Sequence, residues 1–417
     1  MDMTIKWLRK RSKHHEPNDC GDKSRPLRVL IVAPSLDLTG GQAVQAARLV
    51  EHLSDEPSLS VSFLPINPRW PSFFHKLQRI KYLRTIMTSL LYCATLLVRV
   101  RSCDIVHVFS ASYLSFVLAP TPAIIIAKLY RKKVVLNYRS GEAEDHLQRW
   151  NRTAIPTIKL ADVVAVPSGY LVDVFASFGL RARSIFNFVE VTRFPFRERR
   201  QLRPIFLSNR NLEALYNVGC ILRAFAIIQR RYSDAHLIIA GDGTQRQQLE
   251  SLSRELRLRN VRFIGYVAPE KMPEQYDAAD IYLNGSDIDN MPGSIIEAYC
   301  SGLPVVTTNA GGIPYILSDG NTGLMVQRGD YEGMAASAIS LLEDDSRAAK
   351  IIRQAHQECQ KYAWASVREE WLSLYHEIVH GNTNALRTSR PDSRAVANSE
   401  NGIMFERSKA PVNDAML

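Results

Sequence analysis

Short apolar runs alternate with segments of helical periodicity through most of the chain. The first run, Leu27–Pro34, is followed by Gly40-Gly41 and by a stretch, 43–53, whose apolar residues recur at helical spacing. Similar runs, rich in β-branched residues, lie at 61–66, 104–109, 133–138 and 162–167. Strands that alternate with helices in this way predict a parallel, doubly wound sheet.

A second series of the same kind begins after the basic connector 196–204. Its apolar runs lie at 204–209, 235–241, 261–265, 280–285 and 304–308. Helical patterns fill the gaps, for example at 218–232 and 246–258. The chain is therefore expected to be an α/β protein with two Rossmann-like domains of similar size.

An amphipathic packing helix is expected after these domains, because six apolar residues of 364–378 fall on one stripe. They are Trp364, Val367, Trp371, Leu374, Tyr375 and Ile378. The two domains are expected at 27–200 and 201–360, and the helix at 361–380. A basic tail at 1–26 is expected to be disordered or close to a membrane, and the tail at 381–417 is expected to be disordered.

Two uncharged stretches resemble membrane spans without fitting one. Residues 85–98 would reach only about 21 Å as a helix, short of the roughly 30 Å hydrocarbon core, so a buried or interfacial helix is expected. Residues 105–127 contain Pro120 and Pro122 and are expected to form a buried strand, a loop and a helix. The basic start of the chain runs into polar sequence, which argues against a signal peptide.

Composition narrows the class of protein. The 417 residues are 46% hydrophobic and 23% charged, which excludes collagen-like, mostly disordered and disulfide-scaffold chains. The net charge of +10 is unevenly placed: residues 1–200 carry 30 Lys+Arg and 16 Asp+Glu (+14), and residues 201–417 carry 22 and 26 (−4). The six cysteines show no CxxC pair and no zinc pattern, and are expected to be buried thiols.

Two glycine turns follow expected strands. They are Gly40-Gly41-Gln42 and Gly241-Asp242-Gly243. Neither gives the GxGxxG fingerprint, which argues against a nicotinamide or flavin enzyme. Glycines permit close approach of the backbone to a ligand. For the first motif a plain tight turn is an equal alternative, and for the second it is the favoured interpretation.

Residues that could bind substrate or take part in catalysis are most concentrated at 284–297. Pro292-Gly293-Ser294 suits a helix start, where N–H groups up to Ile295 and the positive end of the helix dipole suit a diphosphate. Asp289 precedes this helix and Glu297 lies one turn inside it, so one carboxylate can reach a sugar hydroxyl and the other a ribose. The alternative is that Asp289 only stabilises the dipole and Glu297 is exposed.

Asp287 and Asp289 also form an Asp-x-Asp pair, a pattern that can bind a divalent metal ion. Because the pair directly precedes a helix start suited to phosphate, we expect no metal there.

The order of these features resembles the retaining GT-B glycosyltransferases of family 4, also called group 1. The resemblance spans 27–380 and is strongest over 204–326, in FLSNRNLEALYNV, the AGDG turn, VRFIGYV and LNGSDIDNMPGSIIEAYCSGLPVVTTNAGGIPYIL. It implies two Rossmann-like domains that face a cleft, with the C-terminal helix crossing back to the first domain. It also implies a nucleotide-sugar donor, a glycan or lipid-linked acceptor, transfer with retention of anomeric configuration, and neither metal nor cofactor.

The resemblance also assigns residues. The E-x7-E motif of the family corresponds to Asp289 and Glu297, with Asp in first place, and its diphosphate-binding arginine corresponds to Arg210. As catalytic residues, Arg210 would stabilise the leaving diphosphate, Asp289 would hold the donor sugar and Glu297 the ribose. The residues expected to bind the donor or substrate are Gly40, Gly41, Gln42, Arg139, Glu142, Asn290, Gly293, Ser294 and Ile295.

The chain departs from the family in two places. Five residues beyond Arg210 the family commonly has a lysine, and this chain has Leu215. The family also tends to place a histidine after a strand of the first domain, where this chain has Arg139 and Glu142. His107 is a second candidate for that role, although a hydrogen-bonded core histidine is the simpler interpretation.

The first domain suggests where the acceptor is found. Residues 57–103 contain seven Lys or Arg and no acid, interleaved with Trp70, Phe73, Phe74, Tyr82 and Tyr92. This pattern favours docking on an anionic membrane surface, and hence a cytoplasmic protein peripheral to the inner face of the cell membrane. The alternative is a solvated pair of basic helices.

Two rival functions remain open, and a third is not supported by the sequence. A nucleotide-sugar epimerase can share the fold, and a catalytically impaired sugar- or lipid-binding protein would follow if Leu215 and the missing histidine abolish activity. A nucleic-acid partner is not expected, because no reading helix, RNP pattern or zinc finger accompanies the basic half. The donor, the acceptor and the oligomeric state do not follow from the sequence.

Overall fold

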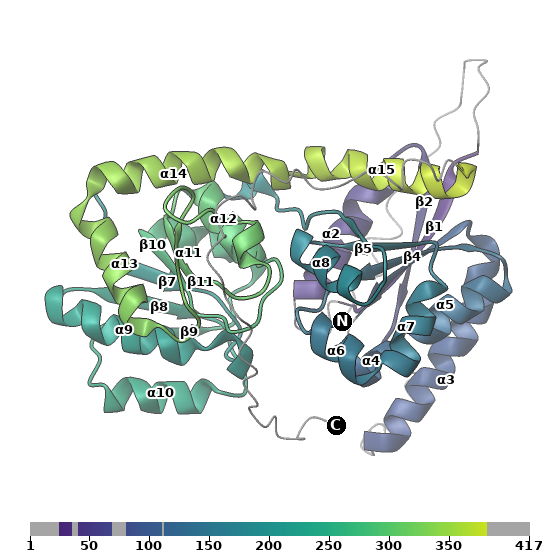
Figure 1. The fold of residues 1–417 in the computed structure, drawn as a ribbon, viewed down its shortest axis with the longest axis horizontal. Helices are drawn as coiled ribbons and strands as arrows, with labels where there is room; N and C mark the ends of the chain where they lie inside the picture. Colours follow the sequence, from purple (N-terminus) through teal and green to yellow (C-terminus); the bar gives the residue numbers. More distant parts are fainter. Residues whose placement is uncertain (1–24, 36–40, 69–80, 111, 382–417) are drawn as a thin grey trace.

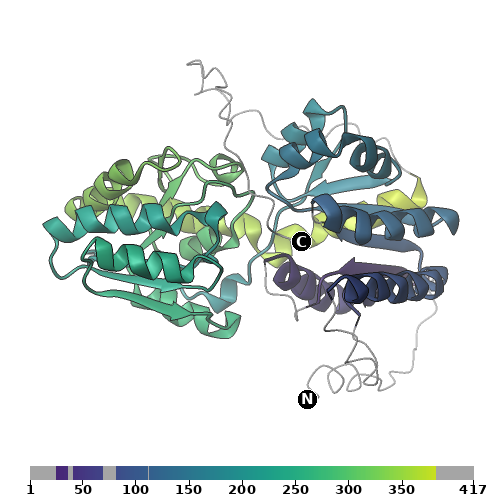
Figure 2. The ribbon, with the colours of Figure 1, turned by 90° about the horizontal axis from the view of Figure 1, so that it is seen from below.

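The computed structural model describes residues 25–35, 41–68, 81–110 and 112–381. It has two α/β domains side by side, each built on a parallel sheet (Figure 1). Helices cover both faces of each sheet, as a view turned by 90° also shows (Figure 2). The expected two-domain α/β architecture is confirmed.

The first sheet has the order β2-β1-β3-β4-β5-β6 and is parallel throughout. Its strands are β1 (Leu27–Ala33), β2 (Leu59–Pro65), β3 (Ile105–Ser110), β4 (Lys133–Tyr138), β5 (Val163–Val166) and β6 (Arg183–Ser184). The sequence predicted all of these except β6, which is two residues long and has no apolar run of its own.

The second sheet has the order β12-β11-β10-β7-β8-β9 and is also parallel. Its strands are β7 (Ile205–Ser208), β8 (His236–Ala240), β9 (Val261–Gly265), β10 (Ile281–Asn284), β11 (Val305–Thr308) and β12 (Leu324–Val326). β12 was not predicted, because it has only three residues.

The helices follow the predicted alternation. In the first domain they are α2 (Gly41–Ser54), α3 (Lys81–Arg99), α4 (Tyr113–Leu118), α5 (Pro120–Leu129), α6 (Ala143–Arg149), α7 (Asn151–Lys159) and α8 (Gly169–Ser177). In the second they are α9 (Val218–Arg231), α10 (Arg246–Glu255), α11 (Met272–Ala278), α12 (Gly293–Ser301), α13 (Tyr331–Glu343) and α14 (Asp345–Cys359).

Strand order reverses once in each sheet. In the first sheet the chain leaves β1 for β2 on one side and returns to β3 on the other, and in the second the same reversal separates β7 from β10. Ligands of open parallel sheets bind beyond the carboxyl ends of the strands at such a reversal. The loops that follow β1 and β3 in the first domain, and β7 and β10 in the second, are therefore placed to bind a ligand.

The last helix, α15 (Trp364–His380), crosses back to the first domain. It continues the line of α14 and lies against the first domain (Figure 1). Five of its residues pack in one core with β1, β3 and α2: Val367, Trp371, Leu374, Tyr375 and Ile378. The amphipathic stripe predicted for this segment is thus confirmed as a packing face.

The two apolar stretches form no membrane span. Residues 85–98 lie within α3, and 105–127 fall in β3, α4 and α5, where Pro120 and Pro122 occupy the first turn of α5. No helix in the described parts of the chain combines the length and the apolarity that crossing a bilayer requires. The tail predicted at 1–26, except its last two residues, and the tail predicted at 381–417, except Gly381, lie outside the described residues.

Candidate active site

A cavity of about 470 Å³ lies between the two domains, beside both reversals of strand order. Ten of the residues predicted to catalyse or bind substrate line it: Gly41, Gln42, Arg139, Glu142, Arg210, Asp289, Asn290, Gly293, Ser294 and Glu297. Gly40, which was predicted with them, lies outside the described residues. The sequence motifs of both domains therefore converge on one site.

Arg210 lies two residues beyond β7 and reaches the loop that follows β10. Its Nη2 donates to Asp289 Oδ2 at 2.6 Å, and its Nη1 donates to Ser294 Oγ at 3.4 Å. Its Cζ lies 4.2 Å from the centre of the Tyr216 ring. The Nε is buried and has no acceptor in the described structure. These contacts hold the guanidinium at the start of α12, within reach of a bound phosphate.

The charge of Arg210 is well supported. Burial lowers the pKa of Arg210, but the Asp289 carboxylate and the neighbouring tyrosines more than offset this effect and the net shift is upward. Burial raises the pKa of Asp289, and Arg210 opposes the rise. The site therefore presents a fixed cation whose carboxylate partner is Asp289.

A glycine turn positions Asp289. The N–H of Gly312 donates to the Asp289 carbonyl at 3.0 Å. Gly311 has a φ of +48°, and a Cβ added there would lie 2.1 Å from the same carbonyl oxygen. Only glycine tolerates both this conformation and this approach. The GGIP sequence at 311–314 thus holds the loop that carries Asp289.

The AGDG turn supports Arg210 in a similar way. Gly241 has a φ of +139°, and a Cβ there would lie 2.3 Å from the Arg210 carbonyl. Leu212 N–H donates to the Asp242 carbonyl at 3.0 Å, which ties the turn to the segment after β7. Of the two interpretations left open for this turn, the structural one applies, because Gly241 and Gly243 do not line the cavity.

The start of α12 faces the cavity as predicted, through Gly293 and Ser294. In the described structure neither residue donates its backbone N–H to another backbone group. Ile295 is different, since its side chain is fully buried in the core of the second domain and its N–H donates to the Pro292 carbonyl at 3.2 Å. Only the first two positions of this helix are thus available to a ligand.

Glu297 lies one turn further into α12 and is held by two residues that the sequence analysis did not identify. Its Oε2 accepts from Tyr276 Oη at 3.0 Å, and its Oε1 lies 3.9 Å from Nη2 of Arg48. Arg48 belongs to α2 of the first domain, so this ion pair crosses the cavity. Burial raises the pKa of Glu297, and Arg48 opposes the rise.

The opposite wall comes from the first domain. Gly41 is the first residue of α2, and Gln42 follows it. Arg139 and Glu142 follow β4, and a Cβ at Gly141 between them would lie 3.5 Å from the Asp289 carbonyl carbon. Ser168 at the start of α8 donates to Asn290 Oδ1 of the second domain. The loops of the two domains are therefore already in contact.

His107 is a core residue, as the simpler interpretation held. It is fully buried, with Nδ1 2.7 Å from Tyr375 Oη of α15 and Nε2 3.0 Å from Asn137 Nδ2. Burial lowers its pKa to about 3, so the ring is neutral at physiological pH. It does not line the cavity.

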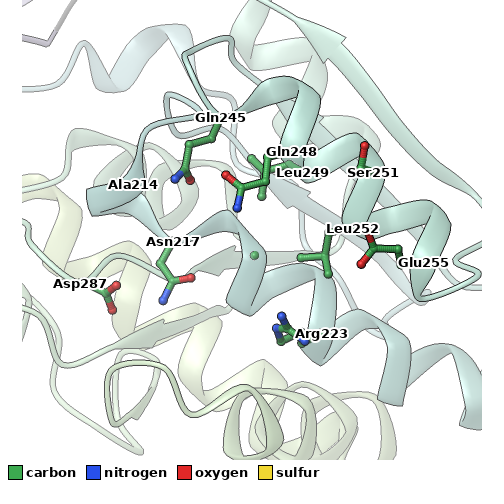
Figure 3. Close-up of a pocket in the computed structure, with 11 residues that line it drawn as sticks. Ala214, Asn217, Arg223, Gln245, Gln248, Leu249, Ser251, Leu252, Glu255 and Asp287 are labelled. Carbon is green, nitrogen blue, oxygen red and sulfur yellow. The ribbon is translucent and has the colours of Figure 1, made fainter. Parts of the chain in front are cut away.

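The two aspartates of the Asp-x-Asp pair diverge. Asp289 binds Arg210, whereas Asp287 lies at the rim of a second cavity of about 460 Å³ bounded by α9 and α10 (Figure 3). Among the described residues, no group of three or more His, Cys, Asp or Glu side chains is placed to hold a metal ion. Leu215, in place of the usual lysine, lines the main cavity but adds no charge to it.

The arrangement is suited to an anionic, phosphorylated ligand. A fixed guanidinium, two free N–H groups and the positive end of a helix dipole lie together on one wall. A buried carboxylate one turn away can accept from hydroxyl groups. The opposite wall adds two further arginines, Arg48 and Arg139, and the start of α2.

Comparison with known proteins agrees with this geometry. Residues 192–358 match the family model "Glycosyl transferases group 1". Over 175 residues the chain is 30% identical to the D-inositol 3-phosphate glycosyltransferase of Corynebacterium urealyticum, which covers 40% of this chain and 41% of that protein. It is 25% identical over 260 residues to the phosphatidyl-myo-inositol mannosyltransferase of Mycolicibacterium smegmatis, covering 61% and 60%. The chain thus spans about two fifths of the first of these relatives.

Solved structures extend the likeness to both domains. HepE of Anabaena, crystallised with UDP and glucose, superposes with a TM-score of 0.66 at 16% identity and covers 84% of this chain and 99% of its own. Sucrose-phosphate synthase from Thermosynechococcus elongatus gives a TM-score of 0.65 at 16% identity, covering 85% and 100%. At this identity the likeness concerns the fold. Residues 192–358 therefore resemble the group 1 glycosyl transferases, within a chain whose two domains together have the GT-B fold.

Proposed function

We propose that the protein is a glycosyltransferase that moves a sugar from a nucleoside diphosphate to a glycan or lipid-linked acceptor. The observation that carries the proposal is the position of Arg210 against Ser294, at the start of α12 and inside the cavity between the domains. A diphosphate there would meet one cation and two backbone N–H groups. The relatives named above as glycosyltransferases support the same conclusion.

The proposed chemistry is electrostatic. As the bond to the sugar breaks, negative charge grows on the leaving diphosphate, where Arg210 and the N–H groups of Gly293 and Ser294 stabilise it. Glu297 would accept from the ribose hydroxyls, and Asp289 would bind a hydroxyl of the transferred sugar once the phosphate competes for Arg210. We propose retention of the anomeric configuration and no metal ion, in keeping with the family resemblance and with the divergence of Asp287 from Asp289.

A donor panel tests this proposal. UDP, GDP and their sugar conjugates are added to the full chain, and the ligand that binds is expected to raise the melting temperature. Release of the nucleoside diphosphate that depends on an added acceptor supports a transferase. An altered sugar without release would indicate an epimerase, and binding without either reaction would indicate a non-catalytic protein. No response to any nucleotide would contradict the proposal.

We also propose that the acceptor is met at an anionic membrane surface on the cytoplasmic side of the cell membrane. The supporting feature is a patch on α3 and α5 where apolar side chains are exposed: Ile86, Leu90, Leu97 and Val98 on α3, and Ile125 and Leu129 on α5. Arg84, Arg99, Arg101 and Arg131 are exposed at its ends. Exposed apolar residues beside arginines fit an interface with anionic lipid.

The sequence prediction for 57–103 needs one change. Tyr92, expected at the interface, is 1% exposed and donates its hydroxyl to the Ala119 carbonyl at 3.0 Å, so it is a core residue. Trp70, Phe73 and Phe74 lie outside the described residues. The membrane proposal therefore depends on the patch of α3 and α5.

Liposome flotation tests the membrane proposal. The protein is expected to float with vesicles that contain phosphatidylglycerol, and to stay in the soluble fraction with phosphatidylcholine alone. The double variant Ile86→Glu/Leu90→Glu should lose flotation. Tyr266→Glu, which changes a somewhat more exposed residue of the second domain, should keep it. Equal recovery in the soluble fraction with both lipids at low salt would contradict the proposal.

A further inference from the structure

Arg139 is a cation with little compensation at the wall of the cavity. It follows β4 and lines the cavity, with its guanidinium 5.2 Å from the centre of the Phe109 ring. Its Nη1 donates to Asn137 Oδ1 at 3.3 Å, whereas its Nη2 is buried and has no acceptor among the described residues. Burial lowers the pKa of Arg139 to about 9, and no carboxylate offsets this effect.

The other two arginines of the cavity differ in this respect. Arg210 is paired with Asp289 and Arg48 with Glu297. Glu142, three residues from Arg139, forms no ion pair with it in the described structure. Burial raises the pKa of Glu142, and repulsion from Asp145 adds a smaller increase. A buried charge without a partner is costly, so proteins retain one where a ligand completes it.

A second donor lies close by. Asn290 is 5% exposed, lines the same cavity, and accepts from Ser168 through Oδ1. Its Nδ2 is buried and has no acceptor among the described residues. A Cβ at Gly141, two residues from Arg139, would lie 3.6 Å from the Asn290 backbone nitrogen. One cation and one amide donor, from different domains, are thus both incomplete in the same part of the cavity.

Arg139 is also held in place from behind. Asn137 Oδ1 accepts from Arg139, so Asn137 Nδ2 donates to His107 Nε2, and the His107 proton must be on Nδ1, facing Tyr375 Oη. This assignment follows from the hydrogen-bond network. The chain of contacts runs from α15 to the cavity and leaves the guanidinium little freedom to find another partner.

We propose that Arg139 and Asn290 bind an anionic group of the substrate that is not the donor diphosphate, either an acid on the transferred sugar or a phosphate or carboxylate on the acceptor. This inference rests on the proposed function, since it concerns the sugar side of the same cavity. Arg139 follows β4 and lines the same cavity as Asp289, and Gly141, two residues away, lies against the loop of Asp289, where the transferred sugar is proposed to bind. An uncompensated cation there favours an anionic substrate over a neutral one.

Matched ligand pairs test the inference in the wild-type protein. For the donor, UDP-glucose is compared with UDP-glucuronate and GDP-mannose with GDP-mannuronate. For the acceptor, glucose is compared with glucose 6-phosphate while the nucleoside diphosphate that binds is held in excess. The anionic member of at least one pair is expected to bind about 10- to 100-fold more tightly. The pair that shows the preference identifies whether donor or acceptor carries the anion.

Three variants decide whether Arg139 is the cause. Arg139→Gln should abolish the preference and leave the affinity for the plain nucleoside diphosphate unchanged. Arg139→Lys should keep part of the preference, and Arg152→Gln, on the exposed face of α7, should keep all of it. The apo melting temperature of Arg139→Gln should equal or exceed that of the wild type, because an incompletely paired buried charge is removed.

Each remaining outcome contradicts the inference in a distinct way. Equal binding within all three pairs by the wild type would overturn it and leave the proposed function intact. If Arg139→Gln kept the preference for the anionic ligand, the anionic group would have to bind at other residues. If Arg139→Gln lost affinity for plain UDP or GDP as much as for the anionic ligand, the result would show that Arg139 binds the diphosphate. Failure to bind any nucleotide would contradict the proposed function and this inference with it.

Discussion

Arg210 and Asp289 follow different strands of the second sheet, and their side chains meet at 2.6 Å over the start of α12. The side chains are 13% and 10% exposed. A donor diphosphate must therefore compete with Asp289 for the guanidinium. Binding of the donor would free the Asp289 carboxylate for a sugar hydroxyl, so one ion pair links recognition of the phosphate to recognition of the sugar.

This pair should be strongly coupled in stability. Arg210→Ala leaves a buried carboxylate and Asp289→Ala a buried guanidinium, so each change is expected to lower the free energy of unfolding by about 3 kcal/mol. The double variant should lose less than the sum, by about 1–3 kcal/mol. Urea denaturation of all four proteins measures the cycle. Additive losses would show that the pair does not act as a unit.

Glu297 should affect donor binding more than turnover. In Glu297→Gln a neutral amide replaces the carboxylate and weakens its hydrogen bonds to ribose hydroxyls. The KM for the donor is expected to rise about 10-fold with kcat within about twofold, which corresponds to roughly 1.4 kcal/mol of uniform binding. Steady-state kinetics checks this. Glu332→Gln, on an exposed position of α13, is the control and should change neither constant.

Two glycines with similar backbone conformation should differ in their tolerance of a methyl group. Gly311 and Gly320 have φ of +48° and +73°, but an added Cβ lies 2.1 Å from the Asp289 carbonyl at Gly311 and meets nothing within 4 Å at Gly320. Gly320→Ala should cost about 1 kcal/mol, from backbone strain alone. Gly311→Ala should cost about 3 kcal/mol and also weaken donor binding. Equal costs would mean that the loop of Asp289 is not held by this turn.

Two buried histidines make stability depend on pH. Burial lowers the pKa of His107 to about 3, and the charge of Arg139 adds to this effect. Burial also lowers the pKa of His146 to about 4, although the charge of Asp145 opposes the shift. Below the ordinary value of 6.5 the unfolded chain therefore binds more protons than the folded protein. The free energy of unfolding should fall as the pH falls from 6.5 towards 4, approaching about 1.4 kcal/mol per pH unit for each histidine.

Substitution separates this contribution from that of the carboxylates. His107→Gln and His146→Gln should each reduce the slope of unfolding free energy against pH between 6.5 and 5. His236→Gln, at an exposed position, should leave the slope unchanged. Urea midpoints at several pH values provide the slopes. A wild-type slope retained in both buried variants would rule out the histidines as its source.

The sequence was informative where the signal is local. Strands such as β1 and β4 are buried on both faces and appear as continuous apolar runs, whereas β6 and β12 are too short to produce one. Asp289, Ser294 and Glu297 lie within one loop and one helix, so their spacing alone placed them together. Their geometry follows from a single helix start.

Residues that reach the site by tertiary packing gave no such signal. Arg48 comes from α2 of the other domain and Tyr276 from α11, and neither stands in a motif. The one available hint for Arg48 was a charged residue beside the apolar positions Ala46 and Leu49 of its helix. For Ile295 the sequence indicated the helix start, but not that its side chain lies in the core and that its N–H donates to the Pro292 carbonyl.

The crossing of α15 has a consequence for biosynthesis. The ribosome makes the first domain before the second, yet the apolar face shared by β1, β3 and α2 is completed only by Trp371, Tyr375 and Ile378. The second domain has all its strands and helices by Tyr362 and can fold before α15 emerges. The domain that is synthesised first is thus finished last, and its uncovered face is where a nascent chain of this protein most needs a chaperone.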